Sequence, residues 1–244
     1  LAVLHPGNPE SQHLFQAAAM AVNVAVAVPA ALRHRRAGAV PSRLFSIVLT
    51  AGVPAIVAGV LLSNRIDGLL LRRVFAAFLV YVAVVSIVKL FRKAPDTAPG
   101  EARVTWLRGG AVGVVMGFAA GLLGIGGGVL AVPLAMTLCR LPLRHCIGVS
   151  SAAMCFTAAV GAALKIGTLP QHGFEPWHAG VLALTLAPTA LLGGWVGAGL
   201  THRLPLNAVR AALIALLLAA AWRMAAPAHE PAAEAPPDII TPDR

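Results

Sequence analysis

A single apolar stretch, residues 106–138, is longer than one membrane crossing requires and is interrupted by glycines. A helix needs about 20 apolar residues to cross a bilayer, and this stretch carries one charged side chain, Arg108, near its start. Its central glycines are Gly124, Gly126, Gly127 and Gly128. Glycine inside a helix costs about 1 kcal/mol relative to alanine, and non-helical backbone at membrane depth persists only where protein or a polar cavity satisfies it. The stretch therefore predicts two helical pieces joined by a turn within the membrane.

We expect the second piece to restart near residues 129–131, with Pro133 in its first turn, where a missing N–H is tolerated. The N-terminus of such a half-helix carries unpaired amides and partial positive charge, which can hold an anion without a charged side chain. The alternative is that the glycines form a hinge for close helix packing. We favour the first interpretation, in which the glycine amides face a bound anion.

Composition places the chain in a membrane. Of its 244 residues, 58% are hydrophobic and 11% are charged, and several windows are long enough to span a bilayer. Beside the glycine-broken segment, the apolar windows predict six helices, at residues 14–32, 44–62, 74–90, 146–164, 179–200 and 206–224. The predicted fold is therefore all-α, a polytopic helical membrane protein with about seven membrane segments. The net charge of +10 comes from Lys and Arg placed between spans, which encodes topology and does not indicate a nucleic-acid partner.

The chain also contains an internal repeat, so we expect two homologous halves. Ala18-Ala-Met20 matches Ala152-Ala-Met154, and Ala30-Ala-Leu-Arg33 matches Ala162-Ala-Leu-Lys165. A paired proline, Pro54 and Pro188, falls in equivalent spans. The predicted units are a first repeat at 1–93, a cytoplasmic linker at 94–105, a second repeat at 106–224, and a disordered tail at 225–244 that has too little to bury.

Run backwards, this alignment places Leu1 just after the counterpart of Pro133. We therefore expect the glycine motif of the first half to lie upstream of Leu1, in a longer protein.

Acidic side chains are missing from the predicted spans. All nine fall in predicted loops or in the tail: Glu10, Asp67, Asp96, Glu101, Glu175, Glu230, Glu234, Asp238 and Asp243. Cation carriers generally place an acid within the bilayer, and metal sites need acids or His clusters. The pattern disfavours a cation pump, predicts no metal site, and favours an anion or a neutral polar solute.

Uncharged polar residues form two stripes in equivalent spans. Gln16 and Asn23 are seven residues apart and share one helix face, as do their repeat partners Ser150 and Thr157. Ser151 adds a hydroxyl beside the second stripe. Individually, such residues are as well explained as hydrogen bonds between helices. Together with the glycine motif, they predict a site for a tetrahedral oxyanion, lined by Gly124, Gly126, Gly127, Gly128, Ser150, Ser151, Thr157, Asn23 and Gln16.

The basic residues give a partial topology. Arg33 and Lys165 end equivalent spans. One interpretation is that they draw anions toward the pore; the other, which we favour, is that both snorkel toward the membrane surface. The loop after the first span and the central loop are both rich in Arg and Lys, so both are expected in the cytoplasm. If the glycine segment crosses the membrane, the halves run parallel; if it re-enters, they are inverted. Transporter precedent favours the inverted arrangement.

The segment from Gly117-Phe118 through the glycine run to Pro133 closely resembles the signature of the TauE/SafE sulfite-exporter-like membrane proteins. The following Ile147-Gly-Val-Ser-Ser-Ala152 is similar to that family's next patch, although Val149 stands where the family often has Thr. The resemblance implies a multi-pass plasma-membrane protein that moves sulfite, organosulfonates or related sulfur or carboxylate anions.

The predicted function is a secondary transporter of small anions, and not an enzyme. Its partners are the lipid bilayer and a small anionic substrate, with no cofactor and no nucleic acid; a homo-oligomer is left open. One alternative is a permease subunit of a multi-component system, although no P-loop or coupling-loop motif is present. The other is an intramembrane hydrolase using Ser150, Ser151 or Cys155, for which no base lies nearby in the sequence pattern.

Overall fold

The computed structural model describes residues 10–91, 103–201 and 206–225, and within them every regular element is a helix. The helices are α1 (Ser11–Arg36), α2 (Ser42–Arg65), α3 (Gly68–Phe91), α4 (Trp106–Leu123), α5 (Gly128–Cys139), α6 (Leu143–Thr168), the short 3₁₀ helix η2 (Leu169–His172), α7 (Pro176–Thr201) and α8 (Leu206–Ala225). The prediction of an all-α protein is confirmed. The tail from residue 226 onward and most of the expected linker lie outside the described residues.

Five of the described helices are long and apolar enough to cross a membrane, namely α1, α2, α3, α4 and α6. Large apolar side chains also cover the outside of the molecule; Leu107 is 84% exposed and Leu184 is 76% exposed. A surface of this kind suits lipid better than water. The multi-pass prediction is confirmed. Helices α7 and α8 coincide with the last two predicted spans, and the count of seven membrane segments stays a prediction.

The glycine-rich stretch is broken, and it forms a hairpin. Helix α4 ends at Leu123 and α5 begins at Gly128, after a turn with positive φ at Gly124, Gly126 and Gly127. The far end of α5 returns to the start of α4, because the amide of Arg103 donates to the carbonyl of Cys139 at 3.0 Å. The segment therefore re-enters on the side from which it came. Pro133 lies in the second turn of α5, one turn later than the sequence predicted.

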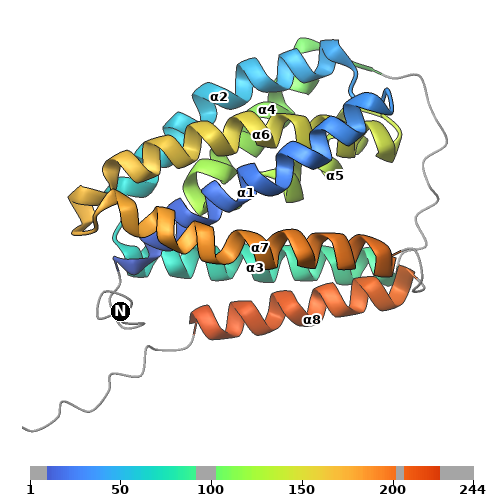
Figure 1. The fold of residues 1–244 in the computed structure, drawn as a ribbon. Helices are drawn as coiled ribbons and strands as arrows, with labels where there is room; N and C mark the ends of the chain where they lie inside the picture. The colour runs from blue at the N-terminus through green and yellow to red at the C-terminus, as the bar shows by residue number, and fades with distance from the viewer. Residues whose placement is uncertain (1–9, 92–102, 202–205, 226–244) are drawn as a thin grey trace, which may run out of the picture.

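Helices α1 and α6 lie against each other in opposite directions (Figure 1). Near the end of α1, the carbonyl of Ala37 accepts from the guanidinium of Arg144 at the beginning of α6. Near the beginning of α1, His13 contacts Lys165 toward the end of α6. Helix α1 also packs on α7, and α6 packs on α2. A twofold relation that exchanges α1 with α6 and α2 with α7 would produce this arrangement, which agrees with inverted repeats; superposition of the halves stays a prediction.

Helix α4 meets α2 through a row of glycines spaced four residues apart, Gly109, Gly113, Gly117 and Gly121. A Cβ at Gly113 would overlap the Val48 carbonyl oxygen, and one at Gly117 would overlap that of Gly52. Small residues in such a row let two backbones approach closely in membranes. The two helices run parallel and hold the end of α4, and therefore the glycine turn, against the bundle.

The hairpin and the antiparallel pair bring eight arginines to one end of the bundle, whereas Arg65, Arg72 and Arg73 lie toward the other. This end contains the end of α1, the beginning of α2, the beginning of α4 and the beginning of α6, which carry Arg33, Arg35, Arg36, Arg43, Arg103, Arg108, Arg140 and Arg144. We call it the arginine end. The described carboxylates, Glu10, Asp67 and Glu175, all lie at the opposite end, where α1 begins and α6 finishes.

Candidate functional site

Three side chains from distant parts of the sequence reach the glycine turn between α4 and α5. The Nε2 of Gln16 donates to the Leu122 carbonyl at 3.1 Å, in the last turn of α4. The Nδ2 of Asn23 lies 3.0 Å from the position that a Cβ on Gly126 would take. Ser150 of α6 contacts the other side, where its Oγ lies 3.5 Å from the Gly128 carbonyl. The structure therefore brings together Gln16, Asn23 and Ser150, as the polar stripes led us to expect.

The turn needs glycine for two reasons, conformation and space. At Gly126, φ is +71°, and a Cβ would lie 3.0 Å from both Asn23 Nδ2 and Met154 Sδ. At Gly127, φ is +73°, and a Cβ would lie 2.6 Å from the backbone oxygen of Met116. An L-residue is strained at such φ values. The backbone here can approach its neighbours only because it carries no side chains.

The first turn of α5 faces this polar group. The amides of Leu130 and Ala131 both donate to the Gly127 carbonyl. The amides of Gly128 and Val129 come at the start of the helix, where no helical carbonyl lies one turn earlier to accept from them. These amides give the helix start its partial positive charge. Asn23 lies about halfway along α1, so the turn sits near the middle of the membrane-spanning bundle.

Two other predicted site residues are less well placed. Thr157 is fully buried, but its hydroxyl donates within its own helix, to the Ala153 carbonyl at 3.1 Å. Ser151 is half-buried, and no hydrogen bond of its hydroxyl is found within the described residues. Of the second stripe, Ser150 alone has a contact with the glycine turn on these observations.

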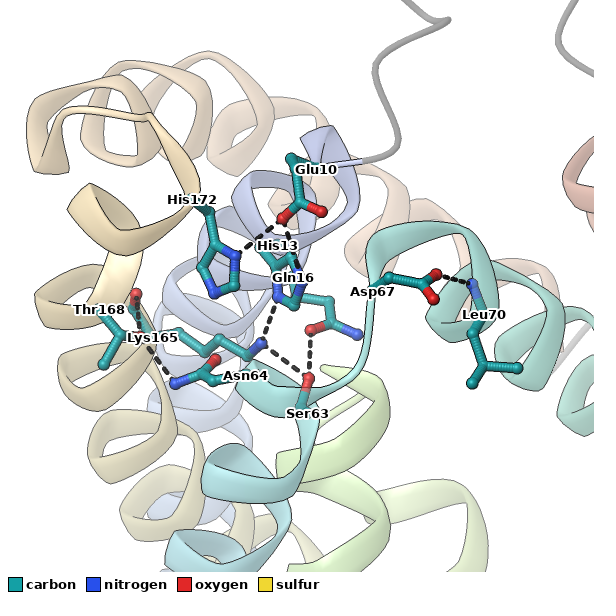
Figure 2. A network of polar contacts seen from close by, with 10 residues as sticks. All are labelled: Glu10, His13, Gln16, Ser63, Asn64, Asp67, Leu70, Lys165, Thr168 and His172. Carbon is teal, nitrogen blue, oxygen red and sulfur yellow. Dashed lines mark hydrogen bonds and ion pairs between the residues drawn. The ribbon is translucent and has the colours of Figure 1, made fainter.

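A second polar group lies beside the first, centred on Lys165 (Figure 2). The side chain of Lys165 is 1% exposed, so the expectation that it snorkels is wrong; Arg33, its repeat counterpart, is exposed. The ammonium nitrogen lies 3.0 Å from His13 Nδ1 and donates to Ser63 Oγ at 2.8 Å. The Ser63 hydroxyl in turn donates to Gln16 Oε1 at 3.2 Å. Gln16 therefore belongs to both groups and joins Lys165 to the glycine turn.

Two further residues connect His13 to the surface. The His13 ring stacks on His172 of η2 with centroids 3.7 Å apart, and His172 Nδ1 lies 2.8 Å from Glu10 Oε2. His13 Nε2 lies 3.7 Å from the same carboxylate oxygen, whose side chain is 37% exposed. Glu10 thus stands between this buried histidine and the outside.

Glu10, His13 and His172 offer ligand atoms within 4.8 Å of one another, but their arrangement does not suit a metal ion. The two imidazole planes are nearly parallel, at 11°, and are stacked. An ion bound by both rings would have to lie in both planes, which stacked rings do not allow. The contacts are those of a hydrogen-bonded network.

The sequence patterns did not indicate His13, Ser63, Glu10 or His172. One signal was available, because His13 is three residues before Gln16 and therefore on the same face of α1 as the predicted stripe. The stacking of His172 could not be read from the sequence, since it depends on the turn that η2 makes after α6.

The profile of the family described as "Sulfite exporter TauE/SafE" matches residues 1–224, almost the whole chain. The chain belongs to the TauE/SafE family. The resemblance seen in the glycine signature is thereby confirmed, and the TauE/SafE description is that of an exporter and not of an enzyme.

Two curated relatives carry the name "Probable membrane transporter protein MamO", one from Paramagnetospirillum magneticum and one from Magnetospirillum gryphiswaldense. Each is 34% identical to this chain over 118 residues, which is 48% of the chain. The match covers 18% and 19% of those proteins, so about half of the chain matches about a fifth of their length. No solved structure matches the chain significantly.

Proposed function

We propose that this TauE/SafE chain is the membrane domain of a secondary transporter for small anions, of which sulfite, organosulfonates and related sulfur or carboxylate anions are the first candidates. The observation that supports it best is the convergence of Gln16, Asn23 and Ser150 on the glycine turn at the start of α5. The family description and the transporter names of the relatives agree with this function.

The anion would bind at the first turn of α5. The first-turn amides of Gly128 and Val129 and the side chains of Asn23 and Ser150 would supply neutral donors there. An anion in a medium of low dielectric needs such compensation, and a helix terminus with several neutral donors provides it without the tight hold of a fixed guanidinium. We keep Gly124, Ser151 and Thr157 as secondary members of the proposed site.

The arginine end would face the cytoplasm, in accord with the positive-inside rule, and the Glu10 and His172 end would face the outside. The membrane would be the inner (plasma) membrane. The glycine turn is reached from both ends only by movement of the helices around it, as in alternating access.

The test substitution is Gly128→Ala, because this glycine does not need a positive φ and an added Cβ would lie 3.4 Å from Ser150 Oγ and 3.5 Å from Met154 Sδ. The methyl group should fit but occupy the space beside the proposed site. Loss of one hydrogen bond to a charged ligand costs about 1.5–3 kcal/mol, so we expect anion exchange to fall roughly tenfold to a hundredfold.

Exchange of labelled sulfite, and separately of labelled isethionate, would be measured by counterflow in proteoliposomes. Gly110→Ala is the matched control, since a Cβ there has no neighbour within 4 Å. Equal exchange by the two variants, with both proteins monodisperse, would contradict the proposed site. No exchange of either anion by the wild type would contradict the proposed substrate class.

A further inference from the structure

Lys165 has a buried basic nitrogen whose close partners are not carboxylates. Its ammonium nitrogen contacts an imidazole and a hydroxyl, and no carboxylate lies within 4.0 Å of it in the described part of the chain. Burying an unpaired charge is costly. The Lys165 side chain is therefore either a neutral amine, or an ammonium whose charge is balanced by an anion that binds nearby.

The contact with His13 limits the protonation states that Lys165 can adopt. Two basic nitrogens 3.0 Å apart form a hydrogen bond only if one donates and the other accepts, so either a Lys165 ammonium donates to His13 Nδ1 or a neutral Lys165 amine accepts from the Nδ1–H of His13. The second state is the one that can take up a proton. The pair has room for one more proton when a negative charge arrives close by. Interacting groups of this kind take up protons as a unit.

A path for that proton leads to the outer end of the bundle (Figure 2). His13 presents Nδ1 to Lys165 and Nε2 to the partly exposed carboxylate of Glu10, at 3.0 and 3.7 Å. His172 holds the same carboxylate and stacks on the His13 ring. An imidazole in this position can take a proton at one nitrogen and give one from the other.

The pair is also connected to the proposed anion site. Two side chains, Ser63 and Gln16, link Lys165 to the Leu122 carbonyl beside the glycine turn. A unit charge on the order of 10 Å from a bound anion, at an effective dielectric constant of about 20, changes the anion's affinity by roughly tenfold. Anion binding and proton binding at Lys165 therefore favour each other.

We infer that Lys165 and His13 form a proton-binding centre that takes up one proton with each anion and so makes the transporter proton-coupled; this rests on the proposed anion site. A proton enters His13 at Nε2 from the Glu10 side. An N–H bond breaks at His13 Nδ1 as one forms at the Lys165 amine, and no electrons are transferred. When the anion leaves toward the opposite face, the ammonium gives its proton to water that enters the emptied site from that face, and Lys165 returns to the neutral amine.

Other ionisable groups lie at this end of the bundle. Around Lys165 the titratable groups are Glu10 just before α1, His13 of α1 and His172 of η2, while α2 contributes Ser63 and Asn64. Asp67, which follows α2, accepts from the Leu70 amide at the start of α3. Arg65 at the end of α2, and Glu175 and His178 at the start of α7, lie at the same end, and none of the three contacts Lys165 in the described network. In the described part of the chain, Lys165 and His13 are the basic residues in the series of contacts that runs from Glu10 through Ser63 and Gln16 to the glycine turn.

The experiment follows proton and anion together in proteoliposomes that contain the purified protein. Isethionate is the probe, because a sulfonate stays ionised across the pH range used and carries no proton itself. Counterflow at equal pH measures anion exchange, and a trapped pH dye measures proton uptake while potassium and valinomycin fix the membrane potential. We expect isethionate entry to acidify the lumen of wild-type vesicles, with one proton for each anion, and protein-free vesicles to show no change.

Lys165→Arg and His13→Gln test the centre in different ways. Arginine stays protonated, and the glutamine amide can accept from Lys165 but cannot pass a proton. In both variants the ratio of protons to isethionate should fall toward zero. Arg33→Gln, at the exposed repeat counterpart of Lys165, should leave the ratio unchanged.

Exchange by the wild type without acidification would overturn the inference and leave the anion transporter standing. An unchanged ratio in both variants would also overturn it, because another group would then carry the proton. If the wild type exchanges neither isethionate nor sulfite, the proposed function and the coupling fall together.

Discussion

Gly117 of α4 lies so close to the backbone of α2 that a methyl group there should destabilise the protein. In Gly117→Ala, the added Cβ would overlap the Gly52 carbonyl oxygen and lie 2.9 Å from its carbonyl carbon. Carbon atoms prefer separations of about 3.5–4.0 Å, and the obstructing atoms are backbone, so no side chain can rotate away. Helices α2 and α4 must move apart by on the order of 1 Å.

Overpacking of this kind costs about 1–3 kcal/mol, while alanine in place of glycine favours a helix by about 0.5–1 kcal/mol. In Gly110→Ala, on the same helix, the added Cβ has no neighbour within 4 Å. This variant therefore gains the helix propensity of alanine without the cost of overpacking. The difference in unfolding free energy between the two variants therefore isolates the overpacking and should be about 1–3 kcal/mol.

The measurement is reversible unfolding in detergent micelles by titration with SDS, followed by circular dichroism. Because α4 positions the glycine turn, Gly117→Ala should also slow anion exchange more than Gly110→Ala does. If Gly117→Ala is as stable as Gly110→Ala, the close α2–α4 contact is wrong, and so is the position that it gives to the end of α4.

Two further predictions concern topology and thiol exposure. Single cysteines at Ala37 and Leu141, in a cysteine-free background, should react from the cytoplasmic side with an impermeant maleimide, whereas one at Gln171 should react from outside; reaction of Leu141→Cys from outside would mean that the glycine segment crosses the membrane. Among the natural thiols in detergent, half-buried Cys155 should react first, and Cys139 and Cys146, both 0% exposed, only after denaturation. Equal rates for all three thiols would contradict the packing of α5 against α6.

The sequence predicted those parts of the fold that follow from composition and backbone conformation. The apolar windows located the helices because a membrane-spanning helix must be apolar along its length, and the glycines between Gly124 and Gly128 marked the break because other residues resist positive φ. The return of α5 beside α4 could not be derived in the same way, since both a crossing and a hairpin satisfy the hydropathy. The Arg103 to Cys139 hydrogen bond decides between them.

The candidate site was predictable in part for a related reason. Gln16 and Asn23 were found because helical periodicity places them on one face, and Ser150 because it matches Gln16 in the repeat. Lys165 was misplaced, because a lysine near the end of a span ordinarily reaches for the surface. Its burial depends on His13 and Ser63, which come from two other helices and have no pattern linking them in the sequence.

The hairpin formed by α4 and α5 has a consequence for how the chain arose. A segment that re-enters adds no crossing, so the predicted second repeat crosses the membrane an odd number of times, through α6, α7 and α8. When a gene for such a unit is duplicated in tandem, the second copy begins on the face opposite to the first and is inserted upside down without any change in its spans. The number of arginines and lysines in its loops must change, because these residues favour the cytoplasmic face. Residues 33–43, from the last turn of α1 to the start of α2, hold four arginines, whereas their repeat counterpart, residues 165–175, holds one lysine and no arginine.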